Sequence, residues 1–136
     1  MTAPLRCTVV SPERPLFEGG AEHVVVPGTK GLLGIYPRHA SMIAKLEPGI
    51  VRIHRPSSEG GATEKFAIGG GFLQVRKDVV TLLVTDAQRR EDVDAGAARD
   101  ELMRVIEELQ HPSSDERYLD LLQSRRRLKA QLSLLH

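Results

Sequence analysis

Hydrophobic and polar residues alternate with a period of two along the first part of the chain, from about residue 5 to residue 85. Successive side chains of a β-strand point to opposite faces, so this alternation predicts strands with one buried face. Turn residues separate the runs, and no segment with helical periodicity lies between them. We therefore expect an antiparallel β-sandwich or barrel. The clearest runs are residues 5–9, 51–53, 66–68, 73–75 and 80–84.

The hydrophobic period changes to that of an α-helix after about residue 90. Apolar residues then recur at spacings of three and four, which places them on one face of a helix. Asp94 stands where it can cap the start of this helix, and Pro112 prevents its continuation. The residues of this first stripe are Ala98, Leu102, Val105, Ile106 and Leu109.

A second apolar stripe follows Pro112 and predicts a second helix. Ser113 and Glu116 have the spacing of a capping box at its start. The short connection predicts that the two helices form an antiparallel hairpin. The sequence thus predicts an α+β protein, with an N-terminal antiparallel β-sandwich over residues 1–86 and a C-terminal two-helix hairpin over residues 87–136. The second stripe consists of Tyr118, Leu121, Leu122, Leu128, Leu132 and Leu135.

The net charge of +1 argues against a protein that binds nucleic acid through a broad basic field, as does the presence of only five aromatic residues. The charge is nevertheless uneven. Residues 1–90 hold 12 basic and 8 acidic residues, residues 91–109 hold 2 and 7, and residues 110–136 hold 5 and 3. The two predicted helices therefore have opposite charge, which favours their pairing.

The residues that usually carry catalysis are not arranged for it here. There is no Gly-Lys-Ser/Thr phosphate loop and no Gly-x-Ser-x-Gly elbow. Gly69-Gly70-Gly71 precedes a strand, where a bulge or a close backbone approach is the expected role. One cysteine, Cys7, and five scattered histidines predict neither a disulfide nor a metal site. We expect a non-enzymatic, soluble protein of a reducing compartment, with no signal peptide or membrane span.

Two further segments each allow two interpretations. Residues 31–40 combine apolar residues with Gly and Pro, which fits either a local plug of the core or an exposed docking edge. The second segment is a basic run, which is either a solvated helix face or a latch for an acidic partner. Its members are Arg125, Arg126, Arg127 and Lys129.

Three stretches together resemble the epsilon subunit of the F-type ATP synthase, in its bacterial form. They are Gly-Ile-Tyr-Pro-Arg-His-Ala at residues 34–40, Pro-Gly-Ile-Val-Arg-Ile at 48–53, and Phe-Ala-Ile-Gly-Gly-Gly-Phe-Leu-Gln-Val at 66–75. The opening Val-Val-Ser-Pro-Glu at 9–13 also fits. The resemblance implies the same order of sandwich and hairpin that the periodicity predicts.

The resemblance also implies a function. Such a subunit is not catalytic; it lies in the central stalk, peripheral to the cytoplasmic face of the bacterial cell membrane, and binds the gamma subunit and the c-ring. Its hairpin can extend toward the catalytic alpha and beta subunits and inhibit ATP hydrolysis, with the basic run as the contact. An alternative is a free-standing, nucleotide-sensing regulatory adaptor of the same fold. The rotor-docking residues implied are Gly31, Leu32, Leu33, Gly34, Ile35, Tyr36, Pro37, Arg38, His39, Ala40 and Met42.

Some bacterial members of this family bind ATP through a motif of Ile or Leu, Asp, two variable residues, Arg and Ala. Residues 93–98 match it at Asp94 and Ala98, but Ala97 stands in the place of the arginine. Without a guanidinium the motif lacks a charge-assisted contact to phosphate. We therefore expect weak or absent ATP binding and no cofactor. Some members also carry an acid where Leu32 stands.

Overall fold

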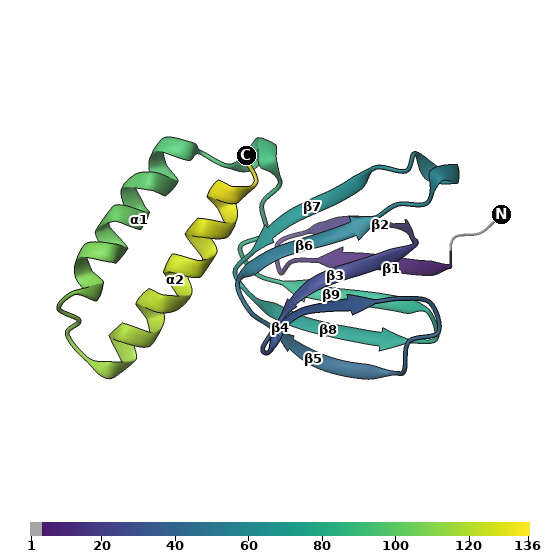
Figure 1. The fold of residues 1–136 in the computed structure, drawn as a ribbon, viewed down its shortest axis with the longest axis horizontal. Helices are drawn as coiled ribbons and strands as arrows, with labels where there is room; N and C mark the ends of the chain where they lie inside the picture. The colour runs from purple at the N-terminus through teal and green to yellow at the C-terminus, as the bar shows by residue number, and fades with distance from the viewer. Residues whose placement is uncertain (1–3) are drawn as a thin grey trace.

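The computed structural model describes residues 4–136 and places a two-helix hairpin against one end of a β-sandwich (Figure 1). The predicted α+β class is therefore confirmed. Helix α2 (Asp115–Ser133) lies next to the sandwich, and helix α1 (Ala95–Leu109) lies outside it. The strands are β1 (Leu5–Val10), β2 (Pro15–Ala21), β3 (His23–Gly28), β4 (Gly31–Ile35), β5 (Met42–Leu46), β6 (Gly49–His54), β7 (Thr63–Ile68), β8 (Gly71–Arg76) and β9 (Val79–Val84), and the 3-10 turns are η1 (Ser57–Glu59) and η2 (Arg90–Asp92).

The strands follow the order β2-β1-β9-β8-β5-β3-β6-β7, with β4 added to β3. Every pair is antiparallel except β1 with β9, which run parallel from Arg6 opposite Val79 to Val10 opposite Leu83. The expectation of a wholly antiparallel sandwich is wrong at this pair. Parallel neighbours need a long crossover connection, and the rest of the sandwich provides it, since β1 and β9 are its first and last strands.

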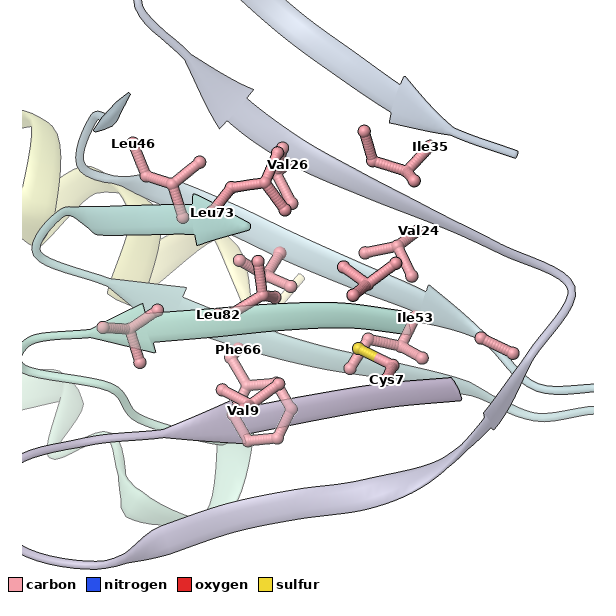
Figure 2. Packing of buried hydrophobic residues seen from close by; sticks show 14 of the residues in the cluster. Cys7, Val9, Val24, Val26, Ile35, Leu46, Ile53, Phe66, Leu73 and Leu82 are labelled. Atoms are coloured by element: carbon pink, nitrogen blue, oxygen red, sulfur yellow. The ribbon is translucent and has the colours of Figure 1, made fainter. Parts of the chain in front are cut away.

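The core of the sandwich lies between the inward faces of its strands and is almost entirely aliphatic (Figure 2). Phe66 is its one aromatic member, and Cys7 is buried among the aliphatic side chains. Burying each large apolar side chain stabilises the fold by about 1.5–3 kcal/mol, so the alternation of the strands determines which face turns inward. Ten members labelled in Figure 2 are Cys7, Val9, Val24, Val26, Ile35, Leu46, Ile53, Phe66, Leu73 and Leu82.

The three glycines between β7 and β8 allow the backbone to pass close to β9. Gly71 has a φ of 148°, and a Cβ atom there would lie 2.0 Å from the carbonyl oxygen of Leu83. No other residue type fits this position without displacing β9. The predicted close backbone approach is therefore confirmed.

The hairpin has a core of its own, separate from that of the sandwich. Ala98 and Val105 of α1 are buried with Leu121 and Leu128 of α2. These residues belong to the two predicted stripes. Ile106 and Tyr118, also placed in the stripes, are 38% and 43% exposed because they occupy the margins of the contact. Leu102, Leu109 and Leu132 complete this core from partly buried positions.

Both helices begin with a side-chain cap. The Asp94 carboxylate accepts a hydrogen bond of 3.0 Å from the Ala97 backbone, as predicted. The predicted capping box at Ser113 is wrong by one residue, since Ser114 is the cap and accepts 3.0 Å from the Arg117 backbone. The third position of the helix is thus an arginine, whose side chain instead pairs with Glu108 of α1 at 2.6 Å.

The hairpin contacts the sandwich through a small apolar cluster that we call the joint. Ala130 and Leu134, near the end of the chain, pack on the buried Ala67 of β7. Ile50 of β6 and Val93 of the linker border this contact. The joint therefore involves far fewer large side chains than either core, so it is the weakest of the three apolar clusters.

Candidate functional site

The outer face of strands β1, β9, β8 and β5 carries apolar side chains in solvent. Phe72 of β8 is 56% exposed and Leu83 of β9 is 54% exposed, and the two are direct cross-strand partners. Val10 of β1 extends the row beyond Leu83. On the other side the partner of Phe72 is Lys45 of β5, and Ile43, 76% exposed, lies diagonally to Phe72, opposite Gln74. We call Val10, Ile43, Phe72 and Leu83 the outer-sheet patch. Clustered apolar residues on a surface are typical of an interaction site.

A groove of about 400 Å³ lies along one end of this patch. Phe72 and Leu83 form its floor together with Val10, and the turn after β1 contributes Ser11 and Pro12. Its walls are almost wholly apolar. Such a groove suits an apolar side chain inserted by a partner protein, because apolar anchors in desolvated pockets supply most of the energy of protein interfaces.

The predicted docking segment, residues 31–42, does not form a single edge. Strand β4 (Figure 1) carries its first five residues along the sheet, a length of roughly 16 Å. Gly31 therefore lies beside Gly28 at one end of β3, and Tyr36 lies against His23 at the other. Leu32 is 70% exposed, whereas Ile35 is fully buried in the sandwich core. The core-plug interpretation therefore applies to Ile35, and Leu32 has the exposure that a docking edge would need. A docking role for this segment stays a prediction.

At the end of the sandwich far from the hairpin, three rings stack across neighbouring strands. Tyr36 lies 5.0 Å from His23, and His23 lies 3.9 Å from His54, between ring centroids. The Tyr36 ring also covers Gly34, where a Cβ atom would come within 2.9 Å of it. Glycine at residue 34 therefore lets the tyrosine reach His23, which gives a physical reason for the Gly-Ile-Tyr sequence.

The stack changes the titration of one of its members. Burial, followed by the charge of His23, lowers the pKa of His54 below its ordinary value. Arg52 and Lys65 act in the same direction, and Glu22 opposes them. The neutral imidazole of His54 is thus the form that the fold favours.

The loop after Tyr36 is anchored to the opposite layer of the sandwich. Arg38 has a φ of 64°, and its backbone N–H donates to the Asp78 carboxylate at 2.7 Å. Asp78 lies in the turn between β8 and β9, at the end of the outer sheet. His39 donates from its backbone to the Tyr36 carbonyl at 3.2 Å. The far end of the predicted docking segment is therefore held in a defined shape.

The four residues of the basic run do not form a single patch. Arg127 donates to Glu101 of α1 at 3.0 Å, within the hairpin. Arg126 approaches Glu47 of the sandwich at 3.9 Å. Arg125 is half-buried and Lys129 is exposed. In the docked hairpin two of the four cations thus face acids of the same chain, and the proposed contact of the run with another subunit stays a prediction.

The two residues that match the ATP motif each have a structural role in the hairpin. Asp94 caps α1, and Ala98 is buried in the hairpin core. Val93 borders the joint, and the side chain of Ala97 points into solvent. The absence of an arginine at residue 97 therefore leaves this surface without the cation that the motif would use on phosphate.

The described chain offers little else that could do chemistry. Burial raises the pKa of the Cys7 thiol to about 12, so it is protonated and unsuited to act as a nucleophile. Over residues 4–136, no three His, Cys, Asp or Glu side chains are grouped so as to hold a metal ion. The same part of the chain contains no helix of the length and hydropathy needed to cross a membrane.

Sequence analysis overlooked the outer-sheet patch, although a signal for it was present. Several strands carry apolar residues at adjacent positions, as in Val9-Val10, Phe72-Leu73 and Leu82-Leu83. Neighbouring residues of a strand face opposite sides, so such doublets place one apolar side chain outward. An outward apolar residue in an otherwise alternating strand was the available indication of a contact surface.

Solved structures of ATP synthases include chains that share this fold. A chain of the Euglena gracilis mitochondrial ATP synthase, in a structure of its OSCP/F1/c-ring, aligns over 100% of this chain and 84% of its own length with a TM-score of 0.83. A chain from the central stalk and c-ring of the Tetrahymena thermophila enzyme aligns over 67% and 70%, with a TM-score of 0.56. At 20% and 19% identity these similarities establish the fold alone.

Similarity in sequence is more specific. The family described as ATP synthase, Delta/Epsilon chain, beta-sandwich domain matches residues 4–90. The ATP synthase epsilon chain of Chromohalobacter salexigens is 38% identical over 116 residues, which are 85% of this chain and 80% of that one. The epsilon chain of Anoxybacillus flavithermus is 41% identical over 106 residues, or 78% and 76% of the two chains. The chain described here therefore belongs to the ATP synthase delta/epsilon family, as a relative of bacterial epsilon chains.

Proposed function

We propose that this chain is a central-stalk subunit of a proton-translocating F-type ATP synthase, where it couples the gamma subunit to the c-ring. The observation that carries the proposal is the outer-sheet patch. It lies on a chain whose relatives in sequence are ATP synthase epsilon chains. A rigid sandwich with an exposed apolar face is suited to docking. The subunit would lie at the cytoplasmic face of a bacterial membrane, held there by the complex.

We assign the outer-sheet patch to gamma. The buried centre of a protein interface is depleted in charge and rich in apolar side chains, and Phe72 and Leu83 meet this description beside an apolar groove. We assign the exposed ends of residues 31–42 to the c-ring. Leu32 offers that ring an apolar contact, where other members of the family carry an acid.

The hairpin has the properties of a regulatory element that inhibits ATP hydrolysis. Beyond the linker, it contacts the sandwich through the small joint and through weak pairs such as Arg126 with Glu47. When the hairpin leaves the sandwich, Arg126 loses its acid and becomes available to an acidic surface of the catalytic alpha and beta subunits. Two states close in energy are what a switch requires.

Truncation tests this inhibitory role. The variant ends after Arg90, which removes both helices and keeps the linker residues that bond to β7. The complex carrying the truncated subunit is expected to hydrolyse ATP faster than the complex carrying the whole chain. Equal rates, with the truncated subunit still present in the complex, would show that the hairpin is not inhibitory.

A pull-down from detergent-solubilised membranes separates the proposal from the adaptor alternative. The tagged chain is expected to bring gamma and the c subunit with it. A free-standing adaptor would bring neither of them. We expect the chain to have no catalytic role. Its contribution to ATP synthesis would be mechanical.

A further inference from the structure

The linker between sandwich and hairpin is hydrogen-bonded to the edge of β7. The Gln88 N–H donates to the Ala67 carbonyl at 2.8 Å, and the Ala67 N–H donates back to the Gln88 carbonyl at 2.8 Å. This is an antiparallel bridge of the kind that joins two strands. Gln88 therefore extends the sheet beyond β7, although it lies four residues after the last strand ends.

The next residue, Arg89, holds the linker with its side chain. Its guanidinium donates to Glu64 of β7 at 2.7 Å and to the Leu16 carbonyl of β2 at 3.3 Å. It also lies 4.5 Å from the ring centroid of Phe66, which is fully buried. Hydrogen bonds from a charged donor and a cation over an aromatic face reinforce one another here. Arg89 is thus attached to the sandwich at three points.

The chain changes character immediately after Arg89. Residues Arg90–Asp92 form the exposed turn η2, and Asp94 then caps α1. Beyond that point the hairpin is held by its own core, and it packs on the sandwich through the joint. The structure therefore has two well-packed bodies, and the short segment from Arg90 to Asp94 connects them.

We propose that Gln88 and Arg89 form a clasp that stays bonded to the sandwich when the hairpin leaves it, so that the hairpin pivots within residues 90–94. The pivot then lies about four to eight residues beyond the division predicted at residue 86. Only the physiological use of this device rests on the regulatory role proposed above. The clasp itself can be tested on the isolated chain, so its failure and the failure of the inhibitory role are separate results.

Amide hydrogen exchange of the full-length chain with an undocked hairpin tests the clasp. Ala130→Glu places a carboxylate in the joint, and Lys129→Glu adds the same group on the exposed side of the same helical turn. We expect Ala130→Glu to speed exchange of the α2 amides by tenfold or more, and to leave the Gln88 and Ala67 amides within about threefold of wild type. Lys129→Glu should change neither set.

The result that would overturn the proposal is exchange of Gln88 and Ala67 in step with α2. This result does not depend on whether the freed hairpin stays helical, because the clasp amides are observed directly.

A second pair of variants tests whether the bridge exists in solution. Gln88→Pro removes the donor to Ala67, whereas Arg90→Pro places proline at the first position of η2, after an extended residue, where it fits.

We expect Gln88→Pro to speed exchange of the Ala67 amide by about tenfold or more, since its partner strand is released. Arg90→Pro should leave that amide within about threefold of wild type. Equal exchange of Ala67 in the two variants would contradict the clasp. Arg89→Met, which keeps the apolar stem of the side chain, should also speed exchange of the Ala67 amide, by a smaller factor than Gln88→Pro.

Discussion

Arg127 of α2 donates from Nη2 to the Glu101 carboxylate of α1 at 3.0 Å, with side chains that are 22% and 45% exposed. The pair connects the basic end of the chain to the acidic first helix. It is therefore one place where the uneven charge of the sequence becomes a contact of the fold.

A double-mutant cycle on this pair should show a modest coupling. We expect Arg127→Ala and Glu101→Ala to be coupled by about 0.5–1 kcal/mol in urea unfolding, because both groups remain partly hydrated. The matched control is Arg126 with Glu47, whose atoms lie 3.9 Å apart and whose coupling should be smaller. A larger coupling for the control pair would contradict this ranking.

Gly71 should be among the least replaceable residues of the sandwich. In Gly71→Ala, the new Cβ would lie 2.0 Å from the Leu83 carbonyl oxygen at a φ of 148°. We expect a loss of more than about 3 kcal/mol of unfolding free energy, since both the clash and the backbone conformation are unfavourable. Gly31→Ala is the control, because its φ is also positive but nothing lies within 4 Å. It should cost about 1–3 kcal/mol, from the backbone conformation alone.

His54 should make the stability of the sandwich depend on pH. Its pKa in the folded protein lies below the ordinary 6.5, mainly through burial and through His23. Above pH 6.5 the imidazole is neutral in both the folded and the unfolded state. The stability that neutral His54 contributes to the folded protein is then fully present. As the pH falls below 6.5 and through the lower pKa of the folded state, protonation favours unfolding and that contribution is lost.

The measurement for His54 is the unfolding free energy at pH 7.5 and at pH 5, for wild type and for His54→Asn. The wild type should lose more stability between the two values than the variant does. Equal losses would show that the stacked pair does not carry this dependence. His111→Asn, at an exposed position between the helices, serves as the control and should behave as wild type.

Sequence reasoning recovered the division into strands and helices because both signals are local. The alternation around Cys7 and the spacing of Leu121 and Leu128 depend only on which faces must be buried. The cap at Asp94 was equally local. The start of α2 was misplaced because Ser113 and Ser114 are adjacent, and only the backbone conformation decides which of them caps.

Features that depend on pairing between distant strands were beyond the sequence. Nothing near Val10 indicates that it lies beside Leu83 in a parallel pair, and that pairing is what assembles the outer-sheet patch. The exposed ends of β4 were likewise treated as one segment, since their separation follows from the direction of that strand. The clasp at Gln88 depends on a contact with Ala67, 21 residues earlier.

The outer-sheet patch should affect assembly and leave folding unchanged. Phe72→Asp replaces an exposed apolar ring with a charge in the middle of the patch. We expect the variant to unfold at the same urea concentration as wild type. Its affinity for gamma should fall at least tenfold, which corresponds to a loss of about 1.4 kcal/mol or more of binding free energy. Arg76→Asp, on the same face of the same strand but at its far end, opposite Val79, is the control and should bind nearly as wild type. Equal binding by the two variants would remove the patch from the interface.

The most direct test of the account is a photocrosslink from the patch in the assembled ATP synthase. A benzoyl-phenylalanine replaces Leu83, and a second version of the chain carries it at Lys65, an exposed position on β7. After irradiation of purified complex, mass spectrometry identifies the attached subunit. The account predicts that residue 83 crosslinks to gamma and that residue 65 does not. If residue 83 of an intact complex forms no crosslink, or crosslinks to a subunit other than gamma, the result would contradict the proposed docking of this chain in the central stalk.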